Sequence, residues 1–225
     1  MKFSAVLIVL VLLAGTAAVE AHEFWLSPDD YTISHADVMQ VRLRVGSGMQ
    51  GPALSYLPHE IVRFEVVQGD KVRAVTGRMG DNPAMAMVGE TDGLAVVVHE
   101  TADSRLTYDD FAIFQRFVAH KDFKTALADH AARGLPDSGF QETYRRYAKS
   151  LIAVGSGAGA DRVMGMKIEI VALANPYTDN LSDGMPLLVL LDGTPRADVQ
   201  VESLLTPALQ RAGDAAATDA ALDTL

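Results

Sequence analysis

The sequence predicts a mainly β protein, an antiparallel β-sandwich with a helical insertion, followed by an incomplete second β region. Three observations support this fold class. Short stretches that alternate apolar and polar residues, separated by turn residues, fill the first half of the chain. The apolar spacing then becomes helical over about residues 107–154. Few β-type stretches follow this segment. The chain has 225 residues, which is long enough to bury a substantial core.

Residues 22–106 form the predicted β-sandwich region. Alternation is clearest in residues 38–45, which read Val-Met-Gln-Val-Arg-Leu-Arg-Val. Residues 61–67 and 72–76 are two further predicted strands, and the Gln-Gly-Asp-Lys sequence between them predicts a hairpin turn. Residues 94–98 form a short apolar run that is typical of a buried strand.

Residues 107–154 form the predicted helical insertion. Apolar side chains recur at helical spacing over residues 109–118 and again over residues 123–131. Asp109 and Asp110 stand at the start of the first of these segments, where carboxylates complement the positive end of the helix dipole. This placement explains the two carboxylates without a catalytic role.

A third helix is predicted at the end of the insertion, over residues 140–154. Ser138 and Gln141 have the spacing of a capping box just before it. The apolar stripe of this helix would consist of Tyr144, Ala148, Leu151 and Ile152. The insertion is therefore expected to be helical throughout.

The second β region, residues 155–204, contains only a few predicted strands. Residues 166–173 and 187–191 have β character, and an Asp-Gly pair then predicts a turn before a last strand over residues 198–204. These strands are too few to close a sandwich of their own.

Both ends of the chain are predicted to lie outside the folded domain. Residues 1–21 have the parts of a secretory signal peptide, namely Lys2 near the start, an apolar centre and small residues before the cut. The apolar centre is shorter than the roughly 20 residues of a permanent span. Cleavage after Ala21 would release a periplasmic protein without stable membrane insertion. Residues 205–225 are rich in Ala and Asp and are predicted to be disordered.

The composition and the motif search exclude several classes of function. The formal net charge of −10 argues against a nucleic-acid partner, and the absence of cysteine excludes disulfides, thiolate metal sites and a cysteine nucleophile. The sequence contains no P-loop, no GxSxG nucleophile elbow and no GxGxxG after a strand. We therefore expect a protein that is not an enzyme.

Three histidines are the candidate metal ligands. Cleavage would leave His22 as the first residue, and its free amine and imidazole together would chelate a borderline cation such as Ni(II) or Cu(II). His99 is expected at the end of a central strand, and His59 just before the strand that begins at Ile61. The predicted site combines His22 with His99 or His59 into three nitrogen donors, which suit Ni, Cu or Zn. Each histidine taken alone is more often an ordinary surface or core residue.

Two pairs of methionines suggest a copper alternative. Met85 with Met87, and Met164 with Met166, place two thioethers on one face of a strand, and soft sulfur suits Cu(I). Methionine more often fills gaps in a core. Burial of these pairs in the core would count against copper.

Other polar residues of the insertion have ordinary explanations. His120 and His130 are expected to face solvent. Arg145, Arg146 and Lys149 could bind an anion, but the acidic excess of the chain makes internal ion pairs the simpler expectation.

Several segments together resemble a family of exported bacterial proteins, the NikM-like domain of unknown function family (family 4198), grouped with nickel-uptake components. The matching segments are residues 21–28, 41–46, 108–117, 133–136, 144–149, 175–177 and 192–196. The resemblance implies an immunoglobulin-like β-sandwich with a helical insertion, a periplasmic location and the binding of nickel or cobalt. The chain departs from the family pattern after residues 199–203, so the C-terminus is expected to be truncated or diverged.

These observations lead to one preferred hypothesis and two alternatives. The preferred hypothesis is a periplasmic, non-catalytic metal-binding accessory protein for nickel or cobalt uptake. Its partners would be the divalent metal ion and a membrane metal transporter or an outer-membrane receptor. The alternatives are a periplasmic copper carrier, and a structural or interaction β-sandwich module that binds no metal.

Overall fold

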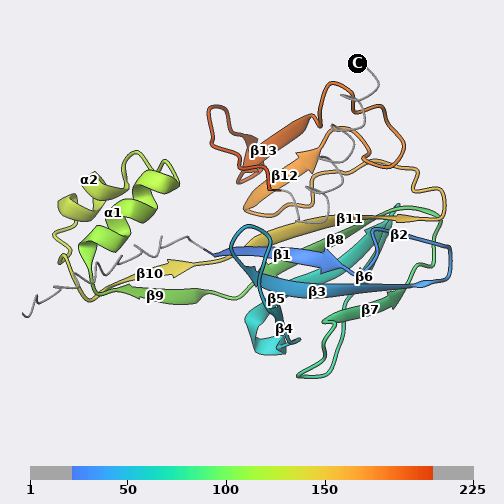
Figure 1. Ribbon diagram of the computed structural model, residues 1–225, viewed down its shortest axis with the longest axis horizontal. Helices are drawn as coiled ribbons and strands as arrows, with labels where there is room; N and C mark the ends of the chain where they lie inside the picture. Colours follow the sequence, from blue (N-terminus) through green and yellow to red (C-terminus); the bar gives the residue numbers. More distant parts are fainter. Residues whose placement is uncertain (1–21, 205–225) are drawn as a thin grey trace, which may run out of the picture.

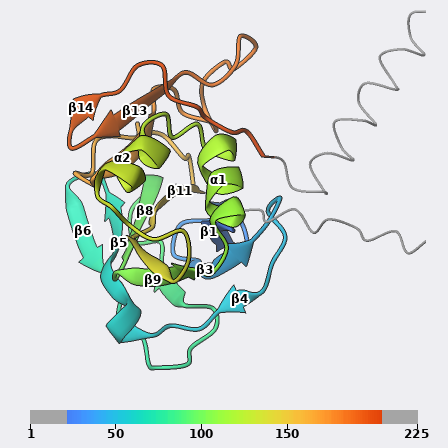
Figure 2. The ribbon, with the colours of Figure 1, turned by 90° about the vertical axis from the view of Figure 1, so that its left-hand side faces the viewer.

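A computed structural model of the protein describes residues 22–204 (Figures 1 and 2). The predicted signal peptide, residues 1–21, and the predicted disordered tail, residues 205–225, lie outside the described residues. The described part is mainly β, as the sequence predicts, and consists of a β-sandwich with a helical insertion. Within it, no helix is both long and apolar enough to span a membrane.

The first sheet of the sandwich, here the β3 sheet, is built around strand β3 (Val38–Gly46). Strands β1 (Glu23–Pro28), β4 (Ala53–Leu54) and β7 (Met85–Val88) all pair with it in antiparallel fashion. The alternation of residues 38–45 predicts this strand correctly, because every second side chain points into the sandwich.

The second sheet, here the β8 sheet, has five strands in the order β2-β11-β8-β5-β6. Strand β8 (Gly93–Thr101) lies at its centre. The predicted hairpin is confirmed as β5 (Ile61–Gln68) and β6 (Lys71–Ala74). The remaining strands are β11 (Tyr147–Val154) and the short β2 (Thr32–Ile33), which pairs parallel to β11.

The main core lies between these two sheets. Inward-facing side chains of both sheets meet there, including Leu26, Met39, Val41 and Leu43 from one and Phe64, Val66, Val97 and Ile152 from the other. The opposite face of the β8 sheet is also buried, and Val67, Val96 and Val98 pack there against Met166 of the second β region. The β8 sheet is thus covered on both sides.

A buried charge cluster joins the second β region to the β8 sheet. The Lys149 Nζ atom lies 3.1 Å from Asp161 Oδ1 and 2.6 Å from Glu169 Oε1, and all three side chains are nearly inaccessible to solvent. The Glu169 carboxylate also accepts hydrogen bonds from the backbone N–H groups of residues 164, 165 and 166. Lys149 therefore has the ion-pair role that the acidic excess predicts.

A two-stranded ribbon extends the β8–β11 pair beyond the sandwich and carries the helices at its tip (Figure 1). The ribbon consists of β9 (Ser104–Tyr108) and β10 (Phe140–Tyr144). Helices α1 (Phe111–His120) and α2 (Ala126–Ala132) follow β9 and precede β10 in the chain. Asp110 caps α1 and accepts a hydrogen bond from Ala112 N at 2.9 Å, as its position before the helix predicts.

The predicted third helix over residues 140–154 is wrong, because this segment forms β10 and β11. In β11, Ala148 and Ile152 face the main core, whereas Tyr147 and Leu151 pack on the opposite side of the sheet. A strand buried on both faces carries apolar residues at successive positions, so its alternation is hidden and resembles a helical stripe. The helical part of the insertion is accordingly shorter than 107–154.

The capping box predicted at Ser138 and Gln141 does not form. Gly139, between them, has a positive φ of 70° and donates its N–H to the Tyr108 carbonyl at 2.8 Å, which starts the ribbon. Gln141 then pairs with Thr107 in the ladder.

The second β region forms a separate three-stranded sheet, β12-β13-β14. Its strands are β12 (Ile168–Ala172), β13 (Leu187–Leu191) and the short β14 (Thr194–Pro195), with the predicted turn between the last two. Residues 198–204 are not a strand, contrary to the sequence prediction. Instead, Gln200 and Glu202 contact the helices, through the His120 carbonyl and Lys121 Nζ.

Candidate functional site

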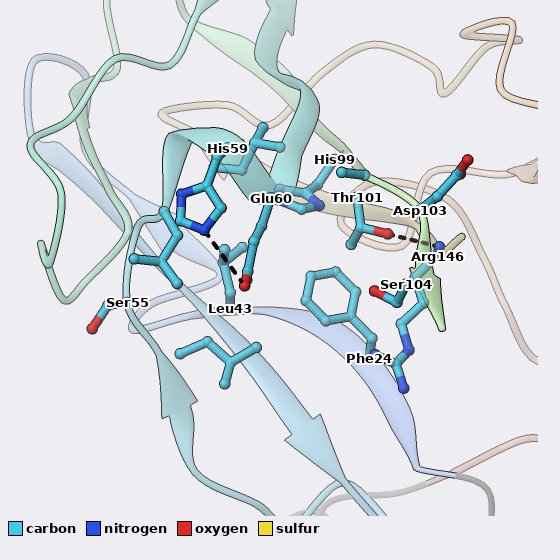
Figure 3. A pocket seen from close by; sticks show the side chains of 14 residues that line it. Phe24, Leu43, Ser55, His59, Glu60, His99, Thr101, Asp103, Ser104 and Arg146 are labelled. Carbon is cyan, nitrogen blue, oxygen red and sulfur yellow. Dashed lines mark hydrogen bonds and ion pairs between the residues drawn. The ribbon is translucent and has the colours of Figure 1, made fainter. Parts of the chain in front are cut away.

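A pocket of about 340 Å³ opens at the end of the sandwich, where the ribbon leaves it (Figure 3). Strands β1, β3, β5 and β8 and the single-turn helix η1 (Pro58–Glu60) meet there. The floor is apolar and includes Phe24, Leu43, Leu54 and Ile61. The polar side chains of the lining are Ser55, His59, Glu60, His99, Thr101, Asp103, Ser104 and Arg146.

His99 is the buried histidine of this pocket. It sits near the end of β8, as the sequence predicts, and only 1% of its surface is exposed. Its ring centroid lies 5.1 Å from that of Phe24 and 4.9 Å from that of Phe64. Burial among these rings disfavours the imidazolium cation and lowers the pKa of His99 from 6.5 to about 4. The imidazole is therefore neutral at physiological pH.

Neither ring nitrogen of His99 has a hydrogen-bond partner among the described residues. An unpaired buried polar group costs about 1–3 kcal/mol, so such groups are rare in native proteins and call for an explanation. A neutral imidazole with free nitrogens is the form of histidine that binds a metal ion. The chemistry of His99 fits a metal ligand.

His59 lines the same pocket from η1, directly before β5, which is the position that the sequence predicts. Its Nε2 lies 3.9 Å from Glu60 Oε1, and both side chains are largely exposed. In Figure 3, His59 and Glu60 stand together on one wall of the pocket, and the carboxylate of Glu60 points inward. The structure therefore brings both histidines to one cavity. His59 is exposed there, whereas His99 is buried.

His22 does not line this pocket. It is exposed and borders a shallow hollow formed with the turn at residues 45–52, where Gly46 and Gly51 approach so closely that a Cβ on either would collide with backbone. His22 precedes Phe24 by two residues and lies just outside β1, which begins at Glu23. Phe24 in turn covers His99.

The described residues alone do not complete a metal site. In residues 22–204, no three side chains of His, Asp or Glu gather closely enough to hold an ion. Tetrahedral and square-planar sites need four donors. With His99 and His59 as nitrogen donors, the remaining donors would have to come from the matured His22, from Glu60 after a rotamer change, or from the bound ligand itself.

The opposite wall of the pocket carries Arg146, for which the sequence predicts an internal ion pair. Its backbone N–H donates to Thr101 Oγ1 at 3.0 Å, and its guanidinium carbon lies 4.8 Å from the centre of the Tyr144 ring. No carboxylate pairs with its guanidinium in the described part of the chain. The neighbouring Arg145 does form the expected ion pair, at 2.8 Å from Asp103. The difference between Arg145, which pairs with Asp103, and Arg146 depends on the register between β8 and β11, which the sequence alone does not show.

The other histidines and the methionine pairs lie elsewhere. His130 is buried among Phe111, Phe114 and Phe140, contrary to the prediction that it faces solvent, because it closes the small aromatic core of the helical insertion. His120 is exposed, as expected.

The methionine pairs are core residues. Met85 and Met166 are almost fully buried, and Met87 and Met164 are partly buried and pack against the same two clusters. None of the four lies in the hollow beside His22. Because the methionine pairs are buried in the core, they count against a copper site built on thioethers.

Comparisons with known proteins identify one family. No curated protein and no solved structure shows detectable similarity to this chain. The model of a family described as a domain of unknown function (DUF4198) matches residues 19–223, which includes most of the C-terminal segment that the sequence predicts to be truncated or diverged. The chain therefore belongs to the DUF4198 family.

Proposed function

We propose that the mature protein is an exported, non-catalytic binding protein for a divalent transition-metal ion, with nickel or cobalt as the preferred cargo. The observation that carries the proposal is His99, a buried neutral imidazole whose two nitrogens have no partner among residues 22–204 and which lines a pocket together with His59. Signal-peptide cleavage, a periplasmic location and delivery to a membrane transporter or outer-membrane receptor belong to the same proposal.

A proton and a metal ion compete for the same imidazole nitrogen. Histidine binds metals only when neutral, and protonation weakens most histidine sites below about pH 6.5. Because the pKa of His99 is about 4, this ligand stays available in mildly acidic surroundings. A binding protein exposed to the changing pH outside the cell benefits from such a ligand.

The preference for nickel or cobalt rests on the sequence resemblance, and the donor types narrow the choice of metal only by disfavouring Cu(I). Imidazole and amine nitrogens suit nickel, copper and zinc, and the sulfur donors that would favour Cu(I) are buried in the core. Nickel uptake is also the setting that the sequence resemblance implies.

Calorimetric titration of the protein beginning at His22 tests the proposal. We expect Ni(II) and Co(II) to bind in one equivalent, and His99→Leu to weaken binding at least tenfold. His59→Ala should weaken it by a smaller factor, because the exposed His59 is less ordered. His120→Ala is the matched control, since His120 is exposed on α1 at the tip of the ribbon, and should bind as the wild type does. Equal affinities of the wild type and His99→Leu would refute the proposal.

A further inference from the structure

The candidate pocket is much larger than a bare metal ion requires. One water molecule takes up about 30 Å³ of liquid volume, whereas this pocket holds about 340 Å³, which is in the range of small-molecule sites. The described side chains also supply too few donors for a complete coordination sphere. An ion bound here must bring further ligands with it, and the pocket has room for them.

The polar groups of the pocket fall into two sets. His99, His59 and Glu60 are on one side, and Arg146 with the hydroxyl of Ser104 is on the other, with the Phe24 ring between them (Figure 3). The first set consists of residue types that bind metal ions. The second set consists of hydrogen-bond donors, and a guanidinium matches the geometry of a carboxylate with two parallel hydrogen bonds.

The backbone of Arg146 is held in place, and its guanidinium pairs with no carboxylate of residues 22–204. The backbone of residue 146 is fixed by two contacts with Thr101, one from Arg146 N to Thr101 Oγ1 and one from Thr101 N to Arg146 O, both at 3.0 Å. The guanidinium lies against the Tyr144 ring. Asp103, which also lines the pocket, is engaged by Arg145 through Nε at 2.9 Å and through Nη2 at 2.8 Å. An incoming carboxylate thus meets Arg146 with little competition.

We propose that the pocket takes up its metal ion as a complex with a small carboxylate-bearing chelator. His59 and His99 bind the metal, His99 once the Phe24 ring that covers its buried nitrogens moves aside, and Arg146 binds a free carboxylate of the chelator. This inference rests on the proposed function and names the chemical form of the cargo. The chelator completes the coordination sphere that the described side chains leave open. Arg146 makes the site selective for the complex over the free ion.

Titrations with three probes test the inference: Ni(II) in a weakly coordinating buffer, the one-to-one Ni(II)–citrate complex, and citrate alone. We expect the complex to bind the wild type at least tenfold more tightly than free Ni(II), and citrate alone to bind weakly. Arg146→Gln should remove the preference for the complex while leaving the affinity for free Ni(II) within about twofold. Arg146→Lys, which keeps the charge but loses the paired hydrogen bonds, should lie between the two.

Arg145→Gln is the matched control, because Arg145 is the adjacent arginine and already pairs with Asp103. It should retain the preference for the complex. Circular dichroism and thermal melting verify that each variant is folded. If the Arg146→Gln variant binds the complex as tightly as the wild type, or if citrate strips nickel from the protein, the inference is wrong while the proposed function stands. If the wild type binds nickel in no form, the proposed function itself fails.

Discussion

The ring centroids of Phe24 and His99 lie 5.1 Å apart, so a side chain of β1 covers the imidazole of a histidine on the facing sheet. Phe64 covers the same imidazole from the neighbouring strand, at 4.9 Å. Neither phenylalanine can replace the hydrogen bonds that the ring nitrogens make in water. The packing of the two rings therefore makes protonation of His99 unfavourable.

This packing makes the stability of the protein depend on pH. Below pH 6.5 the unfolded chain takes up a proton at His99, whereas the folded chain does not until about pH 4. The free energy of unfolding must therefore fall as the pH is lowered through this window, and His99 alone contributes about 3 kcal/mol to the fall. Urea unfolding at pH 7 and at pH 4.5 measures the effect. His99→Leu should reduce the difference between the two pH values by about 2–3 kcal/mol.

The same variant should be no less stable than the wild type at pH 7, because leucine removes two unpaired buried nitrogens at similar volume. His120→Ala, at an exposed position, should keep the full pH dependence. A His99→Leu variant that loses stability in acid as steeply as the wild type would show that His99 is not the titrating group.

Removing the Phe24 ring should make His99 easier to protonate. Phe24→Ala opens the imidazole to water from the pocket side, so we expect the pKa of His99 to rise from about 4 towards 6.5. Titration of the His99 ring protons by NMR measures the shift. Phe123→Ala, which truncates an exposed ring at the helical end of the molecule, should leave this pKa unchanged. An unchanged pKa in Phe24→Ala would mean that Phe64 and the sheet alone exclude water.

The strands of the sandwich were predictable where one face is buried and the other is not. Residues 38–45 show a clean alternation because β3 faces the core on one side only. The same rule fails for β11, which is covered by the main core on one side and by the second β region on the other. That cover arises from residues distant in sequence, such as Met166, so a local pattern could not reveal it.

The candidate site was predictable only in part, because the sequence combines His22 with His99 or His59, whereas the pocket holds His99 and His59 together without His22. The positions of His99, at the end of an apolar run, and of His59, just before β5, are local features of the sequence, and both residues line the pocket. The contribution of Arg146 depends on the pairing of β11 with β8, which sets Arg146 next to Thr101 and leaves Arg145 to Asp103. Two adjacent arginines look equivalent in a sequence. The pairing of β11 with β8 is what gives Arg145 an ion pair with Asp103 and leaves the Arg146 guanidinium in the pocket.

The buried charge cluster should be sensitive to loss of its lysine. Lys149→Ala would leave the carboxylates of Asp161 and Glu169 buried without a counter-charge, so we expect the free energy of unfolding at pH 7 to drop by about 3–5 kcal/mol. Lys124→Ala removes an exposed pair with Asp122 and should cost less than about 1 kcal/mol. Chemical denaturation of both variants provides the comparison. A loss below about 1 kcal/mol for Lys149→Ala would mean that water solvates the cluster.

The free amine of a matured His22 should strengthen metal binding. An N-terminal histidine offers its amine and imidazole to one ion, whereas a preceding residue converts the amine into an amide that no longer binds well near neutral pH. Protein that begins at His22, verified by mass spectrometry, should therefore bind free Ni(II) at least tenfold more tightly than protein with one additional alanine before it. Unfolding in the absence of metal should be the same for both, since His22 is exposed. Equal affinities would exclude His22 as a chelating ligand and leave the pocket histidines, His99 and His59, as the metal-binding residues.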